Sequence, residues 1–255
     1  MIDMQELRKV ARTKGLTNMS YVEKDYFQEI LLLAISREIP DLVFKGGTAL
    51  YKLHGLDRFS EDLDFTGAIT EKQIRALAGY LDDFGYPTKV VQNKPKKGML
   101  LTFVSEGFLY RGTPESMARV QMDISPGELL LDAEWNQVFP LYPDLPSFRV
   151  KAMSIQEMFS EKVRAMLVRK KARDAYDLWF MLNKGVEFDE ILTQRKLDMY
   201  ELKFSKKLLA DALIEVEAVW NRELRALMAS PPEFGAVKAA ILKMAYEHAV
   251  LHGQP

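Results

Sequence analysis

The sequence predicts an α+β fold, in which a mixed sheet with helices over residues 1–150 is followed by an all-helical C-terminal region over residues 151–255. Short apolar runs separated by Gly- and Pro-containing turns occur throughout the first region and indicate strands. Longer segments between them have apolar residues at helical spacing. Strand signals fade after Ser154, and only helical patterns follow. We therefore expect two domains with a boundary near residue 150.

The first region is expected to begin with a helix over Tyr21–Arg37, which ends before Pro40. An apolar run then leads to Gly46 and Gly47, and Thr48 is expected to cap a second helix. Asp62–Phe65 alternates acidic and apolar residues, the pattern of a half-buried strand. The remaining predicted segments are a helix at 71–84, strands at 88–92, 99–104 and 119–124, and a last strand or connector at 147–151.

The second region is expected to open with one long helix. Ser154 and Glu157 have the spacing of a capping box, and the helical pattern continues to about Leu182. Further helices are predicted over roughly 206–228 and 232–251.

Composition excludes several classes of protein. The 255 residues include 35 Lys and Arg against 36 Asp and Glu, so the formal charge of −1 excludes a wholly basic nucleic-acid coat. The chain has no cysteine and three histidines, which excludes disulfides, Cys-ligated metals and thiol catalysis. No apolar stretch approaches the roughly 18 residues of a membrane span, and the N-terminus lacks the apolar core of a secretory signal. A cytoplasmic location is expected.

The strongest chemical pattern joins a glycine turn to an acidic strand. Asp62 and Asp64 are two apart on a predicted strand and so share a face, where a divalent cation would relieve their repulsion. Carboxylates without His or Cys favour Mg²⁺ or Mn²⁺, which often share phosphate ligands. Gly46 and Gly47 before a helix would admit those phosphates. Together, the two patterns predict a site for a metal-bound nucleoside triphosphate. Taken singly, a glycine pair is usually a turn, and an Asp-x-Asp segment is commonly a solvated strand edge.

A second pattern is cationic. On a continuous helix at about 100° per residue, Lys162, Arg169 and Arg173 fall in one stripe, with Asp177 slightly aside. This stripe either meets an anionic ligand or forms an ordinary exposed face with salt bridges.

The first pattern resembles the nucleotidyltransferase superfamily and, more narrowly, the AbiEii and MenT toxin family. The resemblance is carried by Lys45-Gly46-Gly47-Thr48-Ala49-Leu50, Leu53-His54-Gly55 and Arg58-Phe59-Ser60-Glu61-Asp62-Leu63-Asp64-Phe65. It implies a nucleotidyltransferase-like fold, an NTP substrate, and Asp62 and Asp64 as metal and nucleotide ligands. It also implies a functional hydroxyl at Ser60, for which a structural turn is the alternative, and phosphate contact at Thr48, where the family usually has Ser.

The cationic pattern extends the same resemblance, through Glu161, Lys162, Ala165, Arg169, Arg173, Asp174, Asp177 and Leu178. By resemblance, Lys162 binds the triphosphate with help from Arg169 and Arg173, and Asp174 or Asp177 completes the site. The superfamily also has a third carboxylate on a later strand, which joins the metals or activates the acceptor hydroxyl. Asp123 is the candidate here, with a strand-end cap as the alternative.

The resemblance implies transfer of NMP from an NTP to an acceptor hydroxyl, in particular a tRNA 3′ end, by the toxin of a toxin–antitoxin pair. A cognate antitoxin protein is then an expected partner, and Lys94, Lys96 and Lys97 could contact RNA locally. Two alternatives stay open, which are the same chemistry on a small-molecule or protein acceptor and a non-catalytic binding module with the same fold.

Overall fold

The computed structural model describes residues 2–93, 98–126 and 130–251, so Lys94, Lys96 and Lys97 lie outside the described residues. The chain forms two compact units. The N-terminal unit comprises Met1–Gly55 and Phe59–Met153, and the C-terminal unit comprises Leu56–Arg58 and Ser154–Pro255. The sequence predicts one boundary near residue 150. The structure has a boundary at Met153 and Ser154, and it also assigns Leu56–Arg58, within the span of the first motif, to the C-terminal unit.

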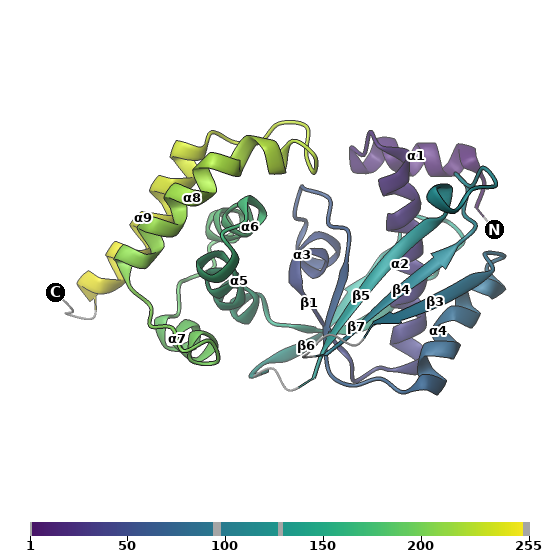
Figure 1. Cartoon of the computed structure of the whole chain (residues 1–255), viewed down its shortest axis with the longest axis horizontal. Coiled ribbons are helices and arrows are strands. Elements are labelled where there is room, and N and C mark those ends of the chain that lie inside the picture. The colour runs from purple at the N-terminus through teal and green to yellow at the C-terminus, as the bar shows by residue number, and fades with distance from the viewer. Residues whose placement is uncertain (1, 94–97, 127–129, 252–255) are drawn as a thin grey trace. The chain divides into compact units, whose positions relative to one another are not determined.

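The N-terminal unit contains a seven-stranded mixed sheet with the strand order β3-β4-β5-β2-β1-β7-β6 (Figure 1). Strands β2 and β5 are parallel, as are β1 and β7, and the other neighbours are antiparallel. The strands are β1 (Val43–Lys45), β2 (Leu63–Thr66), β3 (Thr88–Asn93), β4 (Met99–Ser105), β5 (Ala118–Ser125), β6 (Ala133–Val138) and β7 (Phe148–Met153).

Two acidic residues meet at the centre of this sheet. In the β2–β5 pair, Asp64 lies opposite Asp123, while Leu63 and Phe65 lie opposite Met122 and Ile124. The four apolar side chains are buried and the two aspartates are half-buried. Because side chains alternate between the faces of a strand, both aspartates share the more accessible face.

In the described residues, the α-helices of this unit are α1 (Met4–Lys14), α2 (Met19–Glu38), α3 (Gly46–His54) and α4 (Glu71–Asp83). The expected capping role of Thr48 is wrong. The structure begins α3 at Gly46 with Lys45 in the cap position, and Thr48 lies inside the first turn. Its hydroxyl donates a hydrogen bond to the backbone oxygen of Asp62 instead.

Helix α2 is buried on most of its circumference, including acidic positions. Asp25 and Glu29 receive hydrogen bonds from Lys14 of α1 and Lys52 of α3 at 2.5–2.9 Å. Tyr142 donates a further bond to Asp25 at 2.6 Å. Burial alone would raise the pKa of Asp25, but the charges of Lys52 and Lys14 lower it to about 2. This network of ion pairs ties α1, α2 and α3 together.

The C-terminal unit is helical, as predicted, but its first predicted helix is two helices. Helix α5 ends at Arg169, Lys170 adopts a left-handed conformation with φ of 52°, and α6 starts at Ala172. The predicted cap at Ser154 is confirmed, because its side chain accepts a hydrogen bond from the Glu157 amide. The helices are α5 (Ile155–Arg169), α6 (Ala172–Asn183), α7 (Glu190–Asp198), α8 (Lys206–Leu224) and α9 (Phe234–Leu251).

Trp220 lies in the core of this unit. It is 2% exposed, and its indole nitrogen donates to the Pro232 carbonyl at 2.9 Å. None of the helices in the described part of the chain is both long and apolar enough to cross a membrane.

Candidate active site

The glycine turn and the acidic strand come together as predicted from their pattern. Strand β1 pairs with β2 so that Lys45 lies opposite Asp64, and the turn to α3 begins at the next residue. Gly46 has a φ of +77°, and a β-carbon built there would lie 2.3 Å from Oδ2 of Asp64. The Asp64 carboxylate therefore rests against the turn, and glycine is required both by the backbone and by the space.

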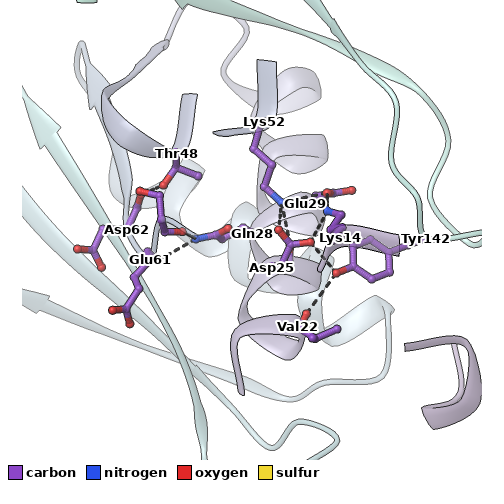
Figure 2. Close-up of polar contacts among 11 residues, drawn as sticks. Lys14, Val22, Asp25, Gln28, Glu29, Thr48, Lys52, Glu61, Asp62 and Tyr142 are labelled. Carbon is purple, nitrogen blue, oxygen red and sulfur yellow. Dashed lines mark hydrogen bonds and ion pairs between the residues drawn. The ribbon is translucent and has the colours of Figure 1, made fainter. Parts of the chain in front are cut away.

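Asp62 lies immediately before β2 and is half-buried. Its backbone oxygen accepts the Thr48 hydroxyl, while its carboxylate extends away from Thr48 and Gln28 (Figure 2). The neighbouring Ser60 uses its backbone oxygen to accept a hydrogen bond from Gln28 at 3.0 Å. Thr48 and Gln28 therefore hold the main chain of Ser60 and Asp62, while the Asp62 carboxylate points away from both side chains.

The residues that would hold a divalent ion are Asp62 and Asp64. In the part of the chain that the structure describes, no three His, Asp or Glu side chains gather closely enough to hold a metal alone. An ion at Asp62 and Asp64 would need phosphate oxygens or water in addition, which is the usual coordination of Mg²⁺ at nucleotides. Asp123 lies opposite Asp64 and accepts a long hydrogen bond, 3.4 Å, from Ser125. Its predicted role as a third ligand stays a prediction.

The close fit of Gly46 gives a direct prediction. We expect Gly46→Ala to displace the Asp64 carboxylate, because the new methyl group cannot share its space. Activity should fall about 100-fold, the usual consequence of shifting a reacting group by about 1 Å. The matched control is Gly79→Ala on α4, since a β-carbon there would meet nothing within 4 Å beyond its own helix. Initial rates of NMP transfer check this, and equal rates for the two variants would contradict it.

The predicted cationic residues form a buried ion-pair network in the C-terminal unit. Lys162 on α5 contacts Asp174 at 3.2 Å and Asp177 at 2.7 Å. Arg169 binds Asp174 through two hydrogen bonds of 2.7 and 2.8 Å. Arg58 binds Asp177 in the same bidentate way, with both bonds at 2.7 Å.

Both acids of this network are fully buried, at 0% exposure. Burial alone would raise the pKa of Asp174, but the charge of Lys162 and the hydrogen bonds from Arg169 lower it well below the usual range. The pKa of Arg58 is raised, since Asp177 and its hydrogen bonds outweigh the opposing effect of burial. Asp174 is therefore ionised and neutralises part of the charge of Lys162 and Arg169.

The single stripe predicted for Lys162, Arg169 and Arg173 is wrong, because the helix breaks at Lys170 and Arg173 belongs to a different helix. Lys162 is buried, Arg173 is exposed, and the Arg169 side chain is 47% exposed. The alternative, an exposed salt-bridged face, does not describe the site either, since Asp174 and Asp177 are buried. Arg169 and Arg173 have the exposure that contact with a ligand requires.

Two contacts were not predicted. Arg58 is part of the quoted first motif, but only the structure shows that it pairs with Asp177, which is 119 positions away in the sequence. Gln28 contacts the main chain of the acidic segment from α2. Glu161 of the second motif accepts a hydrogen bond from Lys196 at 3.2 Å, which is a structural contact.

Solved structures share the fold of this chain. MenT4, a nucleotidyltransferase toxin from Mycobacterium tuberculosis H37Rv, superposes with a TM-score of 0.62 at 22% identity, over 93% of this chain and 87% of that one. JHP933 from Helicobacter pylori superposes with a TM-score of 0.60 at 18% identity, over 96% and 92%. At such identities the likeness shows the fold, and the predicted fold class is confirmed.

The family model for the nucleotidyl transferase AbiEii toxin of type IV toxin–antitoxin systems matches residues 30–243. The chain belongs to this family, and the resemblance seen in its motifs is confirmed. No curated protein matches the sequence.

Proposed function

We propose that this chain transfers NMP from an NTP to an acceptor hydroxyl, with Mg²⁺ or Mn²⁺, and that the acceptor is the 3′ end of a tRNA. The proposal is carried by one observation, the Asp64 carboxylate packed against the Gly46 turn beside Asp62. A carboxylate pair next to a helix N-terminus that has no side-chain cap suits a metal-bound triphosphate better than a free metal ion.

The N-terminal unit would bind the nucleotide through its turn and its acids. Gly46 and Gly47 let the phosphates approach the first amide groups of α3, whose dipole favours anions. Asp62 and Asp64 would hold the divalent ion, which when bound stabilises negative charge on the phosphate oxygens. The Thr48 hydroxyl donates its hydrogen bond to the Asp62 carbonyl and Thr48 is fully buried, so its proposed role is to hold the Asp62 main chain. The phosphate contact expected for Thr48 from the resemblance stays a prediction.

The C-terminal unit would supply cations for the triphosphate. Arg169 and Arg173 are exposed enough for this role, and Arg169 also keeps its bidentate bond to Asp174. Lys162 is bound to both acids, so we propose that it contributes indirectly. It holds Asp174, and Asp174 in turn holds the Arg169 side chain that would contact the triphosphate. Asp174 holds Lys162 and Arg169 in place, and Asp177 holds Lys162 and Arg58.

The reaction forms one bond and breaks one. The acceptor oxygen bonds to the α-phosphorus, the bond from that phosphorus to the bridging oxygen breaks, and pyrophosphate leaves. The acceptor proton passes to a base, for which Asp123 is the proposed group because it shares the accessible sheet face with Asp64. Ser60 stays a proposed neighbouring hydroxyl, two positions before Asp62.

The test is a screen of four α-labelled NTPs against total RNA with Mg²⁺, in which Mn²⁺ replaces Mg²⁺ in a parallel set. We expect label on RNA with at least one NTP, at the 3′ end of tRNA after nuclease mapping. Label on a small molecule or protein instead would contradict the tRNA acceptor. Absence of label in every reaction would contradict the transferase activity.

A cognate antitoxin is the proposed partner, since the family belongs to type IV toxin–antitoxin systems. We propose that both act in the cytoplasm, where tRNA is available. Expression of the wild-type chain without that partner should arrest growth.

A further inference from the structure

We infer that Gln28 of α2 is a positioning residue, which holds the main chain of the acidic segment in the orientation that Asp62 needs. This role rests on the proposed nucleotidyl transfer, because that function makes Asp62 a metal ligand. Gln28 does not touch the substrate in this proposal; it acts through the backbone of the residues before Asp62.

Side chains from two helices hold three consecutive carbonyl groups. The Gln28 amide nitrogen donates to Ser60 O at 3.0 Å and to Glu61 O at 2.8 Å. Thr48 of α3 donates to the next carbonyl, that of Asp62 (Figure 2). Residues 59–62 have no helical or strand assignment, so no backbone ladder fixes their peptide planes. Their orientation depends on these side-chain bonds.

The chemistry of a side-chain amide explains why Gln stands at this position. Gln28 is fully buried, at 0% exposure, where an unpaired polar atom is costly. Its amide nitrogen is bonded to two carbonyl oxygens, whereas its amide oxygen has no hydrogen-bond partner among the described residues. The amide NH₂ has two donors and can serve two carbonyl oxygens at once. Methionine has almost the same shape and would leave both carbonyls without a donor.

Gln28 belongs to a buried polar stripe, defined by Asp25, Gln28 and Glu29, which share one face of α2 at helical spacing. Asp25 and Glu29 bind Lys52 of α3 at 2.6 and 2.9 Å (Figure 2). The same helix begins with the Gly46 turn. One face of α2 therefore holds both parts of the candidate site, α3 through its ion pairs and the acidic segment through Gln28.

One partly buried contact reinforces this arrangement. Lys24, also on α2, forms a salt bridge to the Glu61 carboxylate at 2.7 Å. Both the main chain and the side chain of Glu61 are bound to α2. Since Glu61 directly precedes Asp62, these contacts also restrain the backbone at Asp62. The Asp62 carboxylate, in contrast, extends away from these contacts with α2.

The test replaces Gln28 by Met and uses Gln194→Met as the matched control. Gln194 of α7 also bridges main-chain groups, with its amide nitrogen 2.9 Å from Leu202 O and its amide oxygen 2.9 Å from Phe204 N. It lies in the C-terminal unit, whereas the acidic segment belongs to the N-terminal unit. Both variants lose amide bonds to the backbone, so a general loss of stability should appear in both.

Three measurements are made on the full chain: backbone amide exchange over residues 59–66, Mn²⁺ affinity by calorimetry in the presence of a non-hydrolysable NTP, and kcat and KM for the preferred NTP. For Gln28→Met we expect faster exchange in this segment, and Mn²⁺ affinity and kcat reduced about 10- to 100-fold, as is typical when groups that orient metal ligands are removed. Gln194→Met should stay within about twofold of wild type in all three.

Exchange and Mn²⁺ affinity at control levels in Gln28→Met would overturn the positioning role, even if its unfolding temperature fell. A wild-type chain that transfers no NMP would instead overturn the proposed function, and amide exchange would still decide whether Gln28 holds the segment. If Gln28→Met does not fold, Thr48→Val removes the third bond and is judged by the same exchange and Mn²⁺ criteria.

Discussion

Replacement of Asp64 by Asn is expected to abolish nucleotidyl transfer while the fold remains intact. The amide keeps the shape of the carboxylate, so it can still rest against the Gly46 turn. It loses the charge that would hold a divalent ion beside the phosphates. Because a bound metal contributes several kcal/mol to stabilisation of the transition state, the rate should fall by about a thousandfold or more.

The stability of Asp64→Asn should change little. Asp64 is half-buried and lies beside Asp123 in the sheet, so removal of one negative charge relieves repulsion. Urea unfolding measures this, with initial rates of label transfer from the same preparations. The control is Asp83→Asn, an exposed position on α4. Transfer by Asp64→Asn at even a tenth of the wild-type rate would remove this carboxylate from the mechanism.

Replacement of Asp177 by Ala is expected to have the largest effect on stability, a loss of about 3–5 kcal/mol. The change removes the bidentate partner of Arg58 and one of the two carboxylates at Lys162. Both cations are at least nine-tenths buried, with side-chain exposures of 2% and 8%. A buried cation that loses its carboxylate is not compensated by water.

Asp211→Ala on α8 is the matched control, because Asp211 is an exposed aspartate of the same unit. Its effect should stay within about 0.5 kcal/mol. Denaturant unfolding followed by circular dichroism compares the two variants. If Asp177→Ala unfolds at the same denaturant concentration as Asp211→Ala, the network does not stabilise the C-terminal unit.

The acidic strand and the glycine turn could be predicted because their information is local. Asp62–Phe65 alternates with the period of a strand, and Gly46 precedes a helical pattern. The helical character of the C-terminal region is also visible in the sequence. The break between α5 and α6 is not, because Lys170 adopts a left-handed conformation that a lysine does not signal.

The partners within the site could not be predicted, since they depend on the tertiary fold. Asp25, Gln28 and Glu29 occur at a spacing that usually marks the solvent face of a helix, yet all three are buried. Arg58 and Asp177 are distant in the sequence, and no local pattern connects them. The stripe predicted for the cationic residues required a continuous helix, and the chain divides that segment into α5 and α6.

The central claim is that Asp62 and Asp64 bind a divalent ion together with a nucleoside triphosphate at the Gly46 turn. Calorimetric titration of the full chain with a non-hydrolysable NTP, with Mg²⁺ and with EDTA, tests it most directly. We expect heat of binding with Mg²⁺, and its loss both with EDTA and in Asp64→Asn. Equal binding of the nucleotide in all three conditions, or in none of them, would contradict the claim.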